Sequence, residues 1–143
     1  MTIVLDGIDR TGKDTLHRYL EILGNYKYEI NVRGILTQLA YNEKFNRDYN
    51  YTLNDYKNEV IVFLYGDVED LAVRFKATKE QKLNNKKSLT EGIQDDLELF
   101  SKHVNYLEEH GFIVLKYNTT YNTPYMIAKD IINRLEENDY GRI

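Results

Sequence analysis

A glycine-rich loop between an apolar run and a helical pattern constrains the fold of this chain more than any other feature. The β-branched run Thr2 to Leu5 has the composition of a strand that is buried on both faces of a parallel sheet. The loop Gly7 to Asp14 (GIDRTGKD) follows, and Leu16 and Leu20 then recur at helical spacing. A strand that runs through such a loop into a helix brings backbone N–H groups and the positive helix end to one place. The sequence therefore predicts an anion site near the start of the chain.

The loop matches the phosphate-binding pattern G-x-x-x-x-G-K-[ST] up to its last position, where Asp14 replaces the hydroxyl residue and Thr15 follows. We expect Lys13 to meet the outer phosphates of ATP, and we expect Asp14 to bind Mg²⁺ directly or through water, because Mg²⁺ accepts carboxylate oxygens. Two alternatives remain: a strand-to-helix turn that needs glycines only for its geometry, and an exposed first-turn Asp that only suits the helix dipole. The predicted ATP-binding residues of the loop are Gly7, Ile8, Asp9, Arg10, Thr11, Gly12, Lys13, Asp14 and Thr15.

Predicted strands and helices alternate along the rest of the chain. Strands are expected at residues 26–32, 59–66 and 112–117, and helices at residues 35–45, 67–81, 88–111 and 123–138. Such alternation favours an α/β fold with a mostly parallel sheet. With the glycine loop, it predicts a P-loop NTPase-type three-layer sandwich with a small sheet of about four strands, as one domain over residues 1–143.

Composition excludes several classes of function. The chain has no cysteine, which rules out disulfides, zinc–thiolate sites and cysteine nucleophiles. A net charge of -4 argues against a protein whose main role is to coat nucleic acid. No apolar run approaches the ~18 residues of a membrane span, and the N-terminus lacks the pattern of a signal peptide. We therefore expect a cytoplasmic protein (host cytoplasm if the chain is viral) with no membrane partner.

The segment IVLDGIDRTGKDT resembles the opening of thymidylate kinases, E-G-x-D-x-x-G-K-[ST]-T, and RTGKDT is similar to bacteriophage deoxynucleoside monophosphate kinases, in which Lys is also followed by Asp and Thr. The resemblance implies that Asp14 has a precedent in active kinases. It implies that Asp9 approaches the 3′-hydroxyl of the acceptor sugar, and that Arg10 neutralises the transferring phosphoryl group as a catalytic residue with Lys13. Asp6 stands where the family usually has Glu, which leaves its role open.

A second segment, NVRGILTQLAYNEKF, is similar to the family pattern D-R-x-x-x-S-x-x-A-Y, with Val32 in place of the aspartate. The resemblance implies that Arg33 grips the acceptor phosphate and that Tyr41 belongs to the acceptor site. The alternative is that Arg33 caps the sheet edge and that Tyr41 packs on its helix. Only about twenty residues separate Lys13 from Arg33, where kinases of this group have dozens. The acceptor site is then more open, shared with a second subunit in a homodimer, or altered.

Two further segments concern the nucleotide base and the phosphates. YGDVEDLAVR resembles the family's strand followed by an acidic helix start, which implies that Arg74 stacks on adenine. The loop NTTYNTP follows the last strand, where Thr119 and Thr120 lie near a backbone that could read the adenine edge or that could be only a turn. The lysine-rich residues, about 76–90, suit a lid over the phosphates, a solvated basic loop, or a nucleic-acid contact, which the acidic composition disfavours.

The sequence as a whole predicts ATP-dependent phosphoryl transfer, with Mg²⁺ as cofactor, to a nucleotide acceptor. The favoured acceptor is a deoxynucleoside monophosphate, as the resemblance to thymidylate kinases implies. The alternatives are a kinase for a nucleoside or a nucleic-acid 5′ end, and a non-catalytic module that binds or senses ATP.

Overall fold

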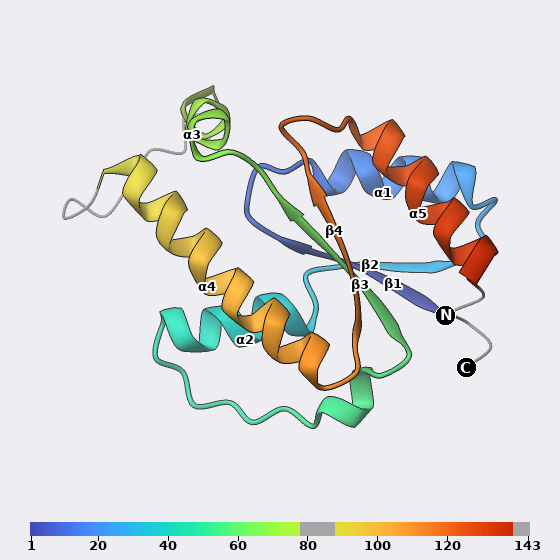
Figure 1. Cartoon of the computed structure of the whole chain (residues 1–143), viewed down its shortest axis with the longest axis horizontal. Coiled ribbons are helices and arrows are strands. Elements are labelled where there is room, and N and C mark those ends of the chain that lie inside the picture. The colour runs from blue at the N-terminus through green and yellow to red at the C-terminus, as the bar shows by residue number, and fades with distance from the viewer. Residues whose placement is uncertain (78–87, 139–143) are drawn as a thin grey trace.

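A computed structural model describes residues 1–77 and 88–138, and a parallel sheet lies at its centre. Its four strands have the order β2-β1-β3-β4, and every pairing between neighbours is parallel (Figure 1). The small parallel sheet predicted from the sequence is confirmed. The strands are β1 (Thr2–Gly7), β2 (Glu29–Val32), β3 (Glu59–Tyr65) and β4 (Ile113–Asn118).

Helices cover both faces of the sheet (Figure 1). One face carries α1 (Lys13–Leu23) and α5 (Pro124–Asn138), which pack against each other. The other face carries α2 (Ile35–Lys44), α3 (Val68–Ala77) and α4 (Leu89–Glu109), and a short 3₁₀ helix, η1 (Leu53–Tyr56), precedes β3. The architecture is thus the three-layer α/β sandwich of the P-loop NTPase type that the sequence predicts.

The central strand β3 shows how the two hydrophobic layers form. Successive side chains of a strand point to opposite faces of its sheet. Val60, Val62 and Leu64 accordingly pack with α1 and α5, and Ile61 and Phe63 pack with α2, α3 and α4. Because β3 is covered on both faces, its continuous apolar sequence is a sound signal for a buried strand.

Strand β2 is shorter than predicted, because residues 26–28 lie in the turn and short connection that follow α1. Asn25 and Tyr26 have positive φ angles of 53° and 57°, and the Tyr26 N–H donates to the carbonyl of Glu21 at 2.9 Å, which closes the end of α1. β2 also lies at the edge of the sheet, where its side chains alternate between exposed and half-buried. An edge strand therefore gave a weaker sequence signal than β3.

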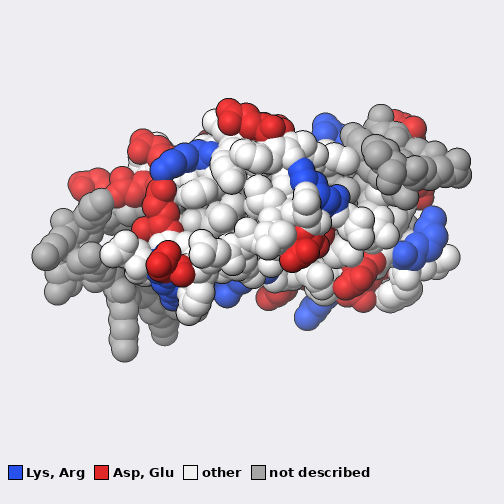
Figure 2. All heavy atoms as spheres, turned by 90° about the horizontal axis from the view of Figure 1, so that it is seen from below, with Lys and Arg blue, Asp and Glu red and all other residues white. Residues whose placement is uncertain are grey.

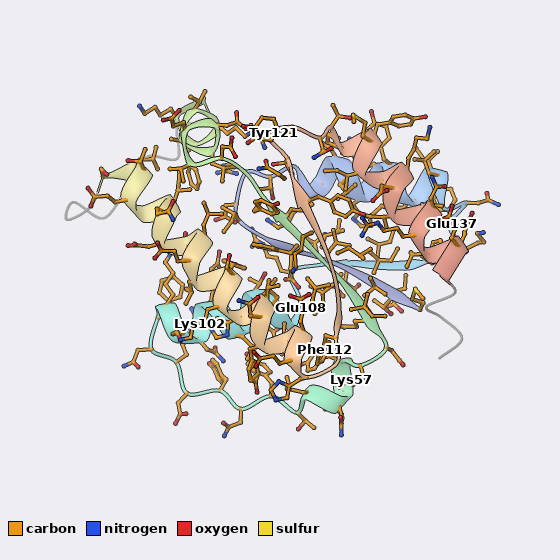
Figure 3. All side chains as sticks on the ribbon, viewed as in Figure 1. Lys57, Lys102, Glu108, Phe112, Tyr121 and Glu137 are labelled. Carbon is orange, nitrogen blue, oxygen red and sulfur yellow. The ribbon has the colours of Figure 1, made fainter. Side chains whose placement is uncertain are left out.

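The carboxyl ends of the parallel strands meet at one edge of the sheet. β1 leads there into the glycine loop, and β2 ends there at Val32, directly before Arg33. In Figure 3 this edge of the sheet lies toward the top, where Tyr121 in the loop after β4 lies beside α3. Lys57 and Phe112 lie toward the bottom, at the opposite end of the sheet. On the face seen from below, acidic and basic side chains are interspersed (Figure 2). In residues 1–77 and 88–138, no helix has the length and apolar character that a membrane span requires.

Candidate phosphate-binding site

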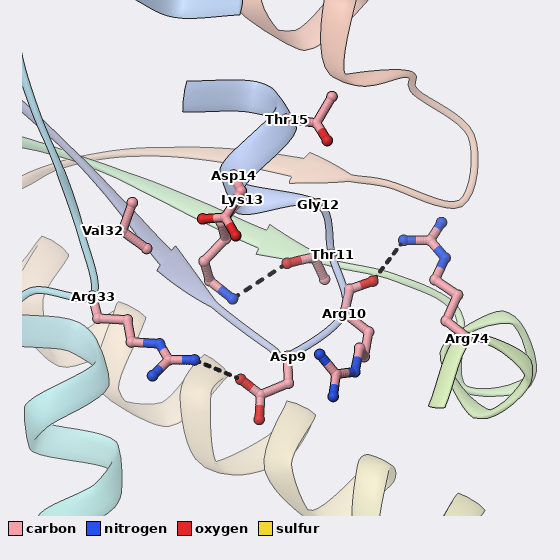
Figure 4. Close-up of a pocket in the computed structure, with 10 residues that line it drawn as sticks. All are labelled: Asp9, Arg10, Thr11, Gly12, Lys13, Asp14, Thr15, Val32, Arg33 and Arg74. Atoms are coloured by element: carbon pink, nitrogen blue, oxygen red, sulfur yellow. Dashed lines mark hydrogen bonds and ion pairs between the residues drawn. The ribbon is translucent and has the colours of Figure 1, made fainter. Parts of the chain in front are cut away.

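A cavity of about 640 Å³ opens at the junction of β1 and α1 (Figure 4). The glycine loop forms one side of it, Val32 and Arg33 at the end of β2 form another, and Arg74 from α3 closes a third. Every lining residue except Val32 is one that the sequence predicts for the site. The lining residues are Asp9, Arg10, Thr11, Gly12, Lys13, Asp14, Thr15, Val32, Arg33 and Arg74.

The loop backbone takes conformations that need glycine or strong support. Gly12 has a φ of 84°, in the left-handed region that glycine enters without steric cost. Arg10 has a φ of 66°, which is uncommon for a residue with a side chain and persists only where the surroundings impose it. The Thr11 hydroxyl donates to the carbonyl of Ile8 at 2.7 Å and so ties the two ends of the turn together.

Lys13 is the buried cation of the site, with only 9% of its surface exposed. Its Nζ donates to the carbonyl of Ile8 at 2.7 Å and to the Thr11 hydroxyl at 3.5 Å. Burial lowers the pKa of Lys13 to about 8, although the nearby carboxylate of Asp9 opposes this shift. A cation with so little water around it interacts strongly with an anion in the same cavity.

The carboxylates of the cavity lining are Asp9 and Asp14, within the part of the chain that the structure describes. Asp9 Oδ1 lies 3.7 Å from Nη2 of Arg33, so these two residues form an ion pair (Figure 4). Asp14 is exposed in the first turn of α1. No cluster of three metal-binding side chains occurs in residues 1–77 and 88–138. Mg²⁺ at Asp14 would therefore need phosphate oxygens and water as its other ligands, a pattern that this ion accepts.

Arg74 joins three elements instead of pointing freely into the cavity. Its Nη1 donates to the carbonyl of Arg10 at 2.9 Å and to the Thr119 hydroxyl at 3.1 Å, and its Nη2 donates to the Thr119 carbonyl at 2.9 Å. Nη2 also pairs with Asp70 at 2.7 Å, and Asp70 accepts from the Thr120 hydroxyl at 3.0 Å. These bonds use the edge of the guanidinium, so stacking on a base would use its planar face. Thr119 and Thr120 do not line the cavity but are tied to it through Arg74.

Tyr41 also lies outside the cavity lining. It is half-buried, and its ring centroid lies 6.1 Å from that of Phe100 and 5.6 Å from that of Phe45. Burial raises the pKa of Tyr41 to about 12, with a further contribution from Asp9. Its packing on α4 is observed, and its contact with an acceptor stays a prediction.

Other predicted residues fall behind the cavity or outside the described chain. Gly7 and Ile8 do not line the cavity, and the Ile8 side chain is buried with the α2 and α4 layer. The lid-like segment predicted at about residues 76–90 lies mostly in residues 78–87, outside the described ranges.

Sequence reasoning missed two features of this region. Val32 was noted only as the loss of an aspartate, yet its side chain lines the cavity. Asp6 was left without a role, yet it is fully buried and accepts hydrogen bonds from Gly34 and Thr37. Burial raises the pKa of Asp6, whereas these hydrogen bonds act in the opposite direction. The partners of Asp6 lie about thirty residues away along the chain, so no local pattern reveals them.

No protein-family model matches the chain, and no curated protein matches it in sequence. Among solved structures, the chain is similar to the crystal structure of the YorR protein from Bacillus subtilis in complex with phosphorylated GDP. The TM-score is 0.76 at 19% sequence identity, and the match covers 98% of each chain. The likeness extends over both chains and shows a shared fold.

Proposed function

We propose that this protein is an ATP-dependent kinase that transfers the γ-phosphoryl group to a nucleotide acceptor, with a deoxynucleoside monophosphate as the favoured class. The observation that carries the proposal is the placement of Lys13 and Arg33, two of the four cationic residues that line one cavity. Lys13 comes from the glycine loop, and Arg33 comes from the end of the neighbouring strand. One cation suits a donor phosphate and the other suits an acceptor phosphate.

The donor side follows from the glycine loop. Its backbone and the start of α1 would hold the β- and γ-phosphates of ATP, with the Lys13 ammonium beside them. Asp14 would hold Mg²⁺, which neutralises phosphate charge when it is bound. Arg10 lines the same cavity and would offset negative charge on the transferred group.

The acceptor side follows from the ion pair between Asp9 and Arg33. Side chains of this pair are partly exposed, so an acceptor could reach both. Arg33 would bind the acceptor phosphate with charge-assisted hydrogen bonds, and Asp9 would accept from the sugar hydroxyl, as the thymidylate kinase resemblance implies. Between Lys13 and Arg33 the chain has only α1 and β2, so we expect the acceptor side to be more open, shared with a second subunit, or altered.

Phosphoryl transfer depends almost entirely on positioning and on charge stabilisation. A few fixed cations can therefore support the reaction without a strong general base. The YorR protein, which has the same fold, was crystallised with phosphorylated GDP, and this supports a phosphorylated nucleotide as the ligand here.

The test is a reaction panel with Mg²⁺ and ATP. Each nucleoside monophosphate, deoxynucleoside and 5′-hydroxyl oligonucleotide is added separately, and ADP and the phosphorylated acceptor are both quantified. A reaction without acceptor measures plain ATP hydrolysis as the control. We expect diphosphate formation from at least one deoxynucleoside monophosphate. Transfer only to nucleosides or oligonucleotides would change the acceptor class, and ATP binding without any transfer would indicate a sensing module.

A further inference from the structure

Asp6 is a buried carboxylate that joins the two sides of the cavity from behind. It lies in β1, directly before Gly7 and the glycine loop, and none of its surface is exposed. Its Oδ1 accepts from the backbone N–H of Gly34 at 2.7 Å, from the Thr37 hydroxyl at 2.5 Å and from the Thr37 N–H at 3.3 Å. Three donors at the start of α2 thus converge on one oxygen of β1.

The turn that these bonds hold is the one that carries Arg33. Arg33 has a φ of 67°, which an Arg residue adopts only where its surroundings impose it. The Arg33 N–H donates to the carbonyl of Leu5 at 2.8 Å, and the next N–H, of Gly34, donates to Asp6. β1 therefore holds the turn through two hydrogen bonds, one accepted by its backbone at Leu5 and one accepted by the Asp6 side chain.

Close packing around Gly34 restricts the position of this turn. A Cβ atom on Gly34 would lie 2.4 Å from Cγ1 of Val4 and 3.4 Å from Oδ2 of Asp6. The backbone of α2 thus approaches β1 as closely as a residue without a side chain permits. A movement of the Asp6 carboxylate would be transmitted directly to Arg33, which is one residue from Gly34.

Burial of a carboxylate in this position is energetically unfavourable, which indicates that Asp6 has a specific role. Oδ2 of Asp6 is buried and has no hydrogen-bond partner in the described part of the chain. Burying such a group without full hydrogen bonding is unfavourable. Burial raises the pKa of Asp6, whereas the N–H groups at the start of α2 and the helix dipole favour its charged form. In that form the carboxylate holds the turn more strongly than a neutral amide could.

We propose that Asp6 is a positioning residue for acceptor binding, which fixes the turn of Arg33 relative to the phosphate loop that begins at the next residue. The inference rests on the proposed function, because it assigns Arg33 to the acceptor phosphate. Asp6 itself touches neither substrate. It acts by keeping the acceptor cation at a constant distance from the donor loop, and small displacements of such groups reduce transfer strongly.

The test compares Asp6→Asn and Thr37→Val with the wild type. Asp6→Asn keeps the shape and removes the charge, and Thr37→Val removes the hydroxyl donor to Asp6 while it keeps the volume. Binding of MgATP and of a deoxynucleoside monophosphate is measured separately by calorimetry. We expect Asp6→Asn to weaken monophosphate binding about tenfold or more, because a displaced Arg33 would lose a charged hydrogen bond to the acceptor phosphate, with little change for MgATP. Thr37→Val should show the same selectivity and stands in if Asp6→Asn does not fold.

A matched control and a double mutant separate positioning from general stability. The Thr123 hydroxyl accepts from the Met126 N–H at 3.2 Å at the start of α5, so Thr123→Ala removes an exposed hydrogen bond at a helix start on the opposite face of the sheet. We expect it to lower stability without any preference for monophosphate binding. In the Arg33→Ala background, Asp6→Asn should have no further effect on monophosphate binding, because both changes remove the same interaction.

Three results would overturn this inference alone. Equal weakening of MgATP and monophosphate binding, or additive effects of Asp6→Asn and Arg33→Ala, would show that Asp6 only stabilises the fold. Unchanged monophosphate binding in both folded variants would show that the turn does not need Asp6. In these cases the wild type still binds both nucleotides, so the proposed function stands. A wild type that binds no monophosphate would overturn both proposals.

Discussion

At the scale of single residues, the site depends on a cation that the fold removes from water. Lys13 is held by the carbonyl of Ile8 within its own loop, and burial brings its pKa to about 8 from an ordinary value of 10.5. The ammonium is thus fixed close to where phosphates would bind, and it is more readily deprotonated than an exposed lysine.

This pKa predicts a pH dependence of ATP binding. The protonated form of Lys13 attracts phosphate, and in the ligand-free protein this form is lost as the pH rises through about 8. We expect the Kd for MgATP to increase between pH 7.5 and pH 9.5, with proton uptake on binding, measured by calorimetry in buffers of different ionisation enthalpy. Lys13→Arg keeps its charge over this range and should bind with a flatter profile. Equal wild-type affinity at both ends of the range would contradict this role.

Asp14 is the second residue with a distinct expectation, because it replaces the usual hydroxyl of the loop. If its carboxylate binds Mg²⁺, ATP affinity should depend on the metal more steeply in the wild type than in Asp14→Asn. With a chelator, Asp14→Asn should bind ATP as well as the wild type or better, since the variant lacks a negative charge that repels the phosphates. Asp14→Ser should recover much of the metal-dependent binding. The measurement is an ATP titration of each variant with Mg²⁺ and with chelator.

A control for Asp14 is Glu69→Gln, which removes an exposed acid from the first turn of α3. It tests whether any first-turn acid would have the same effect, and we expect unchanged metal dependence. Parallel affinities of the wild type and Asp14→Asn, with and without Mg²⁺, would show that Asp14 does not bind the metal.

Residues of the site differ in how well the sequence could predict them. Asp9, Lys13 and Asp14 were predicted because a local pattern of fixed spacing carries the information. Arg74 was predicted to stack on adenine, which stays a prediction. The structure places it in the cavity lining, and its bonds to Arg10 and Thr119 depend on tertiary packing. For the same reason the sequence did not reveal the contacts that Asp6 makes in the tertiary structure.

At the scale of elements, the close packing of β1 on β3 decides how the loop leaves the sheet. Gly7 has a φ of 128°, and a Cβ atom there would lie 2.1 Å from the carbonyl oxygen of Leu64. Ile8, the next residue, still donates its N–H to that carbonyl at 3.0 Å. The first glycine of the loop is thus needed for the contact between strands, and it does not line the cavity.

Gly7→Ala should therefore lower the free energy of unfolding by at least about 3 kcal/mol, because it combines a backbone clash with an unfavourable φ. Gly92→Ala is the matched control. Gly92 lies in α4, and among the described residues no atom beyond its chain neighbours and its own helix backbone lies within 4 Å of an added Cβ. Alanine should therefore stabilise the helix by about 0.5–1 kcal/mol. Urea denaturation measures both changes. Similar stabilities for the two variants would contradict the close packing of Gly7.

Helix and strand boundaries were predictable where burial is strong and less so at the edge of the sheet. β3 is covered on both faces, and its apolar run gave nearly its full extent. For β2 the sequence predicted a strand from Tyr26, but the chain first needs a turn after α1. The turn depends on left-handed backbone at Asn25 and Tyr26, which periodicity does not report.

At the scale of the whole molecule, one sheet edge brings together segments that lie far apart in the sequence. The loop after β1 and the turn after β2 line one cavity, and Arg74 of α3, which also lines it, links the first loop to the loop after β4. The alternation of strands and helices was enough to predict this convergence, because parallel strands share their carboxyl edge. The identity of the acceptor was not predictable, since the chain is short between Lys13 and Arg33.

The most direct test of a working phosphate loop is a single-turnover transfer from γ-labelled ATP to the best acceptor of the panel. Wild type, Lys13→Ala and Lys27→Ala are compared, where Lys27 is an exposed lysine paired with Glu136 away from the cavity. We expect Lys13→Ala to lower the transfer rate by a factor of at least ~100 with its circular dichroism spectrum unchanged, and Lys27→Ala to match the wild type. Transfer by Lys13→Ala at the wild-type rate would contradict the assignment of this loop to ATP.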